Sequence, residues 1–191
     1  MGNPYWVISK LSEQKSSFRN QRSMNYARII LLFLMLSLNG IILHAQAATE
    51  TYCNERYGYC LKYFSALLKP QPIAGNGDGR TFSDAAGKEK LSVYGTGDWT
   101  YTTDGSHLSL KALYQRELSG GPLSQRSGKR VITYQTLKEN WFILSGTDRG
   151  EIFYLKVVKR EDAFCYARLH YLPAETAIYK QTALLIAKEF H

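Results

Sequence analysis

Residues Arg130–Leu172, RVITYQTLKENWFILSGTDRGEIFYLKVVKREDAFCYARLHYL, contain four runs rich in Val, Ile, Phe, Tyr and Thr. The runs are separated by Lys138–Asn140, Gly146–Gly150 and Lys159–Asp162, whose composition is typical of hairpin turns. Connections this short make neighbouring strands antiparallel. The stretch therefore predicts a four-stranded antiparallel sheet, around which the rest of the chain folds.

Side chains alternate between the two faces of a strand, so each run has two faces. We expect one face of the sheet to be purely apolar and to be formed by Phe153, Leu155, Val157, Cys165, Ala167, Leu169 and Tyr171. The other face mixes aromatic and charged side chains, namely Ile152, Tyr154, Lys156, Val158, Phe164, Tyr166, Arg168 and His170. A solvated face is normally polar throughout, so we expect another element to cover part of the mixed face.

Two segments have the period of amphipathic helices, Ser106–Leu118 and Pro173–Phe190. In the second, Pro173 suits the first turn, while Glu175 and Lys188 complement the helix dipole. We expect one helix on each face of the sheet, with the second on the apolar face. The predicted fold class is α+β, a mainly antiparallel sheet with one amphipathic helix on each face, which is an α/β/α sandwich.

Residues 1–47 indicate a signal peptide with a long n-region, because the 15-residue apolar run Ile29–Leu43 precedes a small-x-small cleavage site that ends at Ala47. Met24 is an alternative start. An uncleaved membrane anchor is the competing interpretation, although a spanning helix usually needs about 20 apolar residues. We expect cleavage after Ala47 and one exported domain, residues 48–191, that is periplasmic or secreted and has no stable membrane span.

The net charge of +8 belongs partly to the predicted signal segment. Residues 48–191 hold 19 basic and 15 acidic residues, a surplus of four. The basic residues are spread along the chain in runs no longer than Lys129-Arg130 or Lys159-Arg160. This composition argues against a nucleic-acid-binding surface.

The cysteines fit an oxidising compartment. Cys53 and Cys60 flank a short segment whose centre resembles a tight turn, so we expect them to form a disulfide across a small hairpin. Cys165 remains without a partner and is expected to be a buried thiol on a strand.

The sequence contains no arrangement that commits the chain to a reaction. It has neither an HExxH nor a Gly-x-Ser-x-Gly motif, and Cys165 and His170 fall on opposite faces of one strand. The glycine-rich segment Gly75–Gly79 lacks most ligands of a calcium loop and predicts a turn. We therefore expect no catalytic residue, metal or cofactor, and no enzymatic activity.

A resemblance to a known family is carried by the segments Tyr57–Cys60, Asn76–Arg80 with Phe82, Leu91–Gly95, Thr133-Tyr134, Leu137-Lys138, Trp141-Phe142, Ser145-Gly146, Ile152–Tyr154 with Lys156, and Ile186–Lys188 with Phe190. Through these segments, residues 51–190 resemble a small exported bacterial domain of the PsbP-like, or DcrB-like, α/β/α sandwich type. The resemblance implies this fold and an exported location. Proteins of this fold are generally non-catalytic accessory or scaffold proteins, and the resemblance supplies no active-site residues.

The leading hypothesis is a non-catalytic exported factor that binds another envelope protein, as an accessory component of a bacterial envelope or secretion complex. The 14 tyrosines favour it, since Tyr beside Arg is common in interfaces. The candidate partner-binding residues are Tyr154, Tyr166, Arg168 and His170, which we expect on the mixed face. In the competing interpretation the helix hides the tyrosines, and the alternative function is a small-ligand carrier or enzyme with a helix–sheet cleft.

Overall fold

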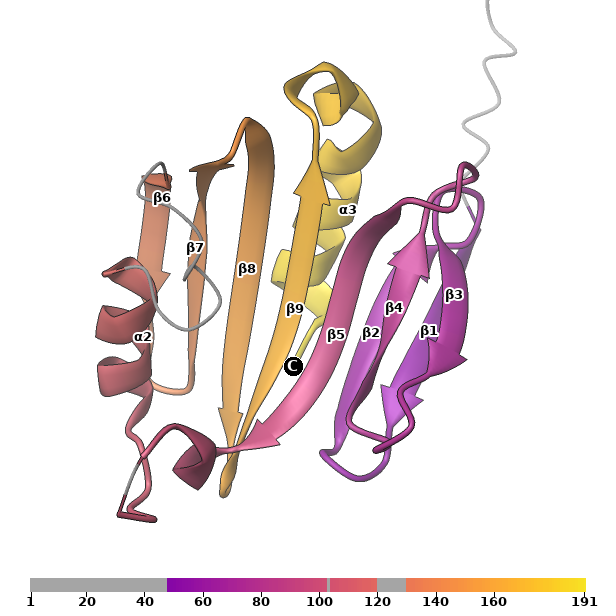
Figure 1. Ribbon diagram of the computed structural model, residues 1–191. Coiled ribbons are helices and arrows are strands. Elements are labelled where there is room, and N and C mark those ends of the chain that lie inside the picture. The colour runs from indigo at the N-terminus through magenta and orange to yellow at the C-terminus, as the bar shows by residue number, and fades with distance from the viewer. Residues whose placement is uncertain (1–47, 103, 120–129) are drawn as a thin grey trace, which may run out of the picture. The chain divides into compact units, whose positions relative to one another are not determined.

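The computed structural model of the chain describes residues 48–102, 104–119 and 130–191; the predicted signal peptide and Met24 lie outside them. Within the described residues a seven-stranded antiparallel sheet has the order β3-β4-β5-β9-β8-β7-β6 (Figure 1). The strands are β3 (Lys69–Ile73), β4 (Gly79–Ser83), β5 (Glu89–Gly97), β6 (Val131–Leu137), β7 (Trp141–Asp148), β8 (Glu151–Arg160) and β9 (Ala163–Tyr171). The four strands predicted around the three turns are β6 to β9, so that prediction is confirmed.

Short turns and one long crossover set the strand order. Arg149, in the β7–β8 turn, has a φ of 51°, the left-handed conformation of tight hairpins. The β8–β9 turn consists of Glu161 and Asp162, and Glu161 has a φ of 39°. After β5 the chain crosses to the far edge of the sheet through the short helix η1 (Asp98–Tyr101) and α2 (Leu110–Leu118). The return through β6 to β9 then places β9 beside β5.

A separate hairpin, β1 (Thr49–Asn54) and β2 (Tyr59–Phe64), packs against the main sheet. Cys53 and Cys60 lie opposite each other in this hairpin and form the predicted disulfide. Closing a loop of this length stabilises the folded state by about 2.5 kcal/mol in the chain-entropy model. The disulfide thus fixes the turn that follows β1.

Each face of the main sheet carries one helix, as predicted (Figure 1). The α3 face is covered by α3 (Thr176–Glu189) and the β1–β2 hairpin; its buried residues include Leu91, Val93, Cys165, Ala167, Leu169, Tyr179, Ile186 and Phe190. The α2 face packs Leu110, Leu113 and Tyr114 of α2 on Phe142, Leu144, Phe153, Leu155, Val157, Phe164 and Tyr166. No helix among the described residues is both long and apolar enough to cross a membrane.

The expected composition of the two faces is wrong. Leu155 pairs with Arg168, and Val157 pairs with Tyr166, so the apolar face of β8 is continuous with the mixed face of β9. The apolar residues of β8 and the mixed residues of β9 therefore lie beneath α2, and the C-terminal helix α3 covers the opposite face of the sheet. The physical reason is that register, and not similarity of composition, decides which residues of two strands share a face.

Two buried lysines fix the ends of α3. Lys90 is 1% exposed and bonds both carboxylate oxygens of Glu175, just before the helix, at 2.7 Å. Lys156 donates to the carbonyl of Ala187 in the last turn at 2.7 Å. A carboxylate at the start and an ammonium at the end both match the helix dipole. Pro173 begins the preceding short helix η2 (Pro173–Glu175), which agrees with its predicted first-turn role.

Candidate functional site

A cavity of about 680 Å³, here called the end pocket, opens at the end of the main sheet where β5, β6 and β8 finish. Its walls come from the β1–β2, β6–β7 and β8–β9 turns and from η1. Lining residues with charged or aromatic side chains include Glu55, Arg56, Tyr57, Trp99, Lys159, Arg160, Glu161 and Asp162. The pocket therefore combines residues that are distant in sequence.

Two glycines of β5 allow aromatic rings to lie directly on the sheet. A Cβ at Gly95 would lie 2.1 Å from the ring of Tyr57, and a Cβ at Gly97 would lie 2.6 Å from the indole of Trp99. Residues two apart project from the same face of a strand, so both rings line the same side of the pocket. Trp99 nevertheless remains 50% exposed, which leaves part of its indole available for contact.

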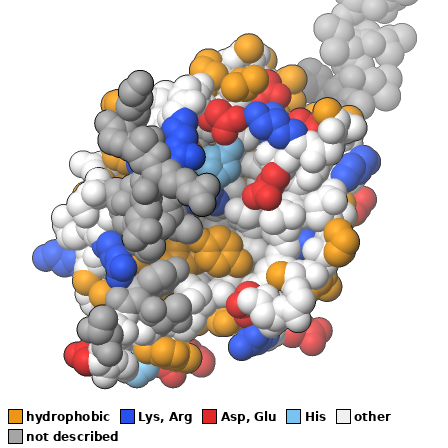
Figure 2. Space-filling model, viewed as in Figure 1, with side chains coloured by type: hydrophobic (Ala, Val, Ile, Leu, Met, Phe, Trp, Pro, Cys, Tyr) orange, Lys and Arg blue, Asp and Glu red, His pale blue; other side chains and the backbone are white. Residues whose placement is uncertain are grey.

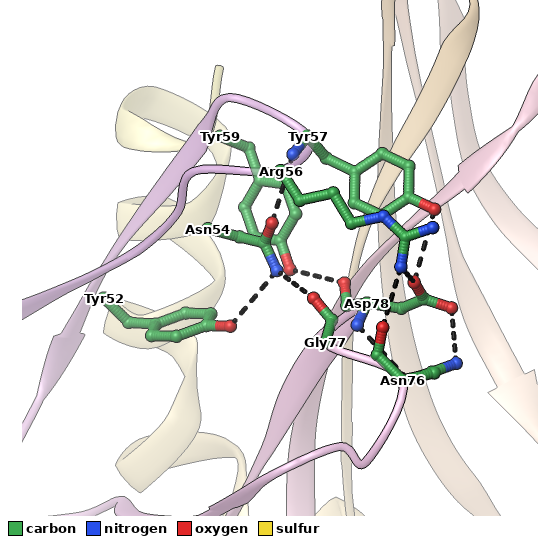
Figure 3. A network of polar contacts seen from close by, with 8 residues as sticks. All are labelled: Tyr52, Asn54, Arg56, Tyr57, Tyr59, Asn76, Gly77 and Asp78. Carbon is green, nitrogen blue, oxygen red and sulfur yellow. Dashed lines mark hydrogen bonds and ion pairs between the residues drawn. The ribbon is translucent and has the colours of Figure 1, made fainter.

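A network of hydrogen bonds holds the β1–β2 turn against the β3–β4 turn (Figure 3). Asn54 donates to the carbonyl of Gly77 at 2.9 Å and accepts from the amide of Tyr57 at 3.1 Å. Arg56 forms an ion pair with Asp78 at 2.8 Å, and the Tyr57 hydroxyl donates to the same carboxylate at 3.3 Å. The glycine-rich turn thus positions Arg56 and Tyr57 for the pocket.

Asp98 lies beside the end pocket and is only 2% exposed. Its carboxylate bonds Nδ1 of His107 at 2.7 Å and forms an ion pair with the ammonium of Lys159. Burial acts to raise the pKa of Asp98, but the hydrogen bonds from Lys159 and His107 outweigh it and hold the pKa below its ordinary value. The ring of His107 meets the indole of Trp99 edge-on at 6.1 Å. His107 therefore connects the buried carboxylate of Asp98 to the exposed indole of Trp99.

Asp98, His107 and Asp162 place possible metal-ligand atoms within 4.8 Å of one another. Carboxylate and imidazole groups suit several divalent ions. The ammonium of Lys159 already bonds Asp98, however, so a metal would have to displace this cation. The carboxylate of Asp98 is thus already paired with a cation, and the expectation of no metal stays a prediction.

Cys165 is a free, buried cysteine, as predicted. Burial raises its pKa to about 11, so the thiolate that acts as a nucleophile is scarce at neutral pH. The thiol contacts the carbonyl of Tyr57 at 3.7 Å and packs on the α3 face. These features match a small hydrophobic core residue.

The four predicted partner-binding residues do not form one patch. Tyr154 pairs with Leu169 on the α3 face, whereas Tyr166, Arg168 and His170 lie on the α2 face. The prediction that all four share a face is wrong, because the antiparallel register joins even-numbered residues of β8 to odd-numbered residues of β9. Their part in partner binding stays a prediction.

On the α2 face the predicted residues are largely covered. Tyr166 is fully buried and stacks on Tyr94 with ring centroids 4.7 Å apart. Arg168 and His170 are half-buried. Figure 2 shows hydrophobic side chains next to basic groups and a histidine near the middle of this face. The sequence therefore correctly predicted a sheet face that mixes aromatic and charged side chains, but Tyr166 of that face is a core residue.

Burial also controls the charges near His170. Burial, together with the positive charge of Arg168, lowers the pKa of His170 to about 4. Nearby, Glu117 is 1% exposed and faces Arg130 at 3.5 Å. Burial raises the pKa of Glu117 and lowers that of Arg130. This part of the molecule thus holds several charges away from bulk water.

A second region, here called the β6 surface, consists of the exposed Val131 and Tyr134 and the half-buried Trp141, Ile152 and Tyr154 on the α3 face. Val131 is 56% and Tyr134 is 54% exposed. The edge strand that carries them, VITYQTL, contains no charged residue. Val131 and Tyr134 were not predicted as site residues from the sequence, although the absence of charge from a strand after a long connection is a usable signal.

No protein-family profile matches the chain, and no curated protein is significantly similar to it. Among solved structures, the chain is similar to the solution structure of cyanobacterial PsbP (CyanoP) from Synechocystis sp. PCC 6803. The TM-score is 0.54 at 16% sequence identity, over 76% of this chain and 92% of the other. The chain therefore has a PsbP-like fold, as the resemblance implied, and identity this low establishes the fold alone.

Proposed function

We propose that the chain is a non-catalytic, exported protein-binding factor of a bacterial envelope or secretion complex, and that the β6 surface binds its partner. The observation that carries this proposal is the exposure of Val131 and Tyr134 on an uncharged edge strand. Exposed apolar side chains that gather with Tyr and Trp are typical of protein interfaces. The disulfide supports the exported location, because such bonds persist in oxidising compartments.

The expected occupant is an extended, mainly uncharged segment of another envelope protein that adds a strand to β6. The amide of Lys138 donates to the carbonyl of Trp141 at the β6–β7 turn. Because bonded residues alternate along an antiparallel pair, the backbone groups of Gln135 and Leu137 point away from β7. A partner strand would satisfy these groups and cover Tyr134, as in other cases of strand addition.

The opposite edge of the sheet provides a contrast. Strand β3 contains Pro70 and Pro72, which lack an amide hydrogen and so cannot donate to an added strand. β3 was not predicted from the sequence, because those prolines indicated a break. Of the two described edge strands of this sheet, only β6 combines a neutral sequence with an amide hydrogen on every residue.

The test is site-specific photo-crosslinking in living bacteria. A photoreactive residue at Tyr134 is expected to capture one discrete envelope protein, and the same residue at Ile73, which is 56% exposed on the β3 edge, is not. Val131→Lys should abolish that capture without lowering thermal stability, while Ile73→Lys should leave capture intact. Equal capture at both edges, or capture that survives Val131→Lys, would refute binding at β6.

The end pocket favours a second candidate function, the binding of a small ligand. Its volume lies within the range of ligand sites in proteins, and it carries an exposed indole beside charged groups. This candidate is independent of the β6 surface. A ligand retained through purification, and lost on substitution of Trp99, would support it.

A further inference from the structure

We propose that the end pocket binds an organic cation, that is, an amine or guanidinium group such as a lysine or arginine side chain of a basic peptide, or a free polyamine. The inference gives the second candidate function its ligand class. It does not depend on partner binding at β6, because no residue of the β6 surface lines the end pocket.

The charges of the pocket lining that are not already paired favour a cation. Of the three basic residues that line the pocket, Arg56 is paired with Asp78 and Lys159 with Asp98. Arg160 forms no ion pair with a described residue. The three acidic residues of the lining form no ion pair with described residues either; they are Glu55, Glu161 and Asp162. Three carboxylates against one guanidinium leave a surplus of two negative charges.

The positions of two aromatic rings in the pocket also favour a cation. Trp99 rests on Gly97 with its indole half exposed, and Tyr57 rests on Gly95 on the same face of β5. A cation over an aromatic face is attracted by the ring quadrupole, and Trp gives the strongest attraction. An amine placed between the indole and the carboxylate of Asp162 would use both interactions. A neutral ligand would leave the carboxylates without a counter-charge.

Arg160 does not cancel this preference. Its guanidinium lies near Gly58, since a Cβ built on that glycine would be 3.7 Å from Nε and Nη2. It therefore lies beside the β1–β2 turn, whereas the carboxylate of Asp162 lies within 4.8 Å of possible ligand atoms of His107 and Asp98, and the ring of His107 meets the indole of Trp99. The pocket is thus acidic beside Trp99, where the cation is expected.

The experiment is isothermal titration of the purified chain at low ionic strength, since salt screens exposed charges. The probes are spermidine, a tetra-arginine peptide and, as a neutral control, a tetra-glutamine peptide. Both cations are expected to bind and the neutral peptide is not. A clear preference for the peptide identifies a protein partner as the source of the cation, and a preference for spermidine identifies a free polyamine.

Substitutions then locate the site. Trp99→Leu is expected to weaken binding about tenfold and Asp162→Asn about threefold. Glu89→Gln, an exposed carboxylate elsewhere on β5, is the matched control and should have no effect. The inference is overturned if neither cation binds, if sulfate binds better than spermidine, or if Trp99→Leu leaves the affinity unchanged.

Glu161→Gly separates binding from folding. The φ of 39° at Glu161 favours glycine, so this variant is expected to fold at least as stably as the natural chain. It nevertheless removes one carboxylate and should weaken cation binding about threefold. Unchanged affinity in a stable Glu161→Gly variant would exclude the β8–β9 turn from the site.

Discussion

Acidification is expected to destabilise the fold through His170. Burial, together with Arg168, lowers the pKa of this histidine from 6.5 to about 4 in the folded chain. The unfolded chain therefore binds a proton at a pH where the folded chain does not, and stability falls as pH decreases from about 6.5 to about 4. The penalty is about 2 kcal/mol at pH 5 and approaches about 3 kcal/mol below pH 4. Above pH 7 it vanishes.

The assay is urea unfolding of the natural chain and of His170→Gln between pH 4 and 8. Other groups titrate in both proteins, so the difference between their two pH profiles isolates His170. The natural chain should lose about 2 kcal/mol more than the variant between pH 7.5 and pH 5, or about 6 °C in Tm. Parallel profiles would show that His170 is protonated with an ordinary pKa and would refute the burial argument.

Three further predictions test the fold. Glu175→Gln should destabilise the protein by about 2 kcal/mol in urea unfolding, because it leaves the buried Lys90 ammonium poorly paired, and adding Lys90→Met should recover most of that loss. Gly95→Val should cost at least about 2 kcal/mol in the same assay, because its side chain would displace the ring of Tyr57; a silent substitution would contradict the ring position. Reducing the β1–β2 disulfide should lower stability by about 2.5 kcal/mol, while Cys165 should stay unreactive to thiol reagents until the protein unfolds.

The parts of the fold that could be predicted are those governed by local chemistry. The runs of β6 to β9 are separated by short polar turns, so strand direction and order follow from the sequence. The disulfide joins residues that a tight hairpin places opposite each other. Helix α2 begins later than predicted, at Leu110, because Ser109 caps it by accepting from the amide of Ala112.

Features that depend on contacts between distant segments could not be predicted. Tyr57 and Trp99 are brought together by glycines on β5, and nothing in the spacing of Gly95 and Gly97 indicates which rings will cover them. Asp98 and Lys159 lie 61 residues apart and meet at the pocket. Tyr154 and Tyr166 were wrongly predicted to share a face for the same reason. Which residues of two neighbouring strands lie on the same face depends on how the strands pair.

The two edges of the main sheet support the proposed interface by comparison. An unpaired strand invites association with other chains, and proteins usually protect edges with proline or charge. β3 has such protection in Pro70 and Pro72, whereas β6 has none and exposes Val131 and Tyr134. Since the same chain protects one edge with proline, the lack of proline and charge in β6 is not a general feature of its edge strands. The proposed partner would account for this difference, because it would cover β6 and bury Tyr134.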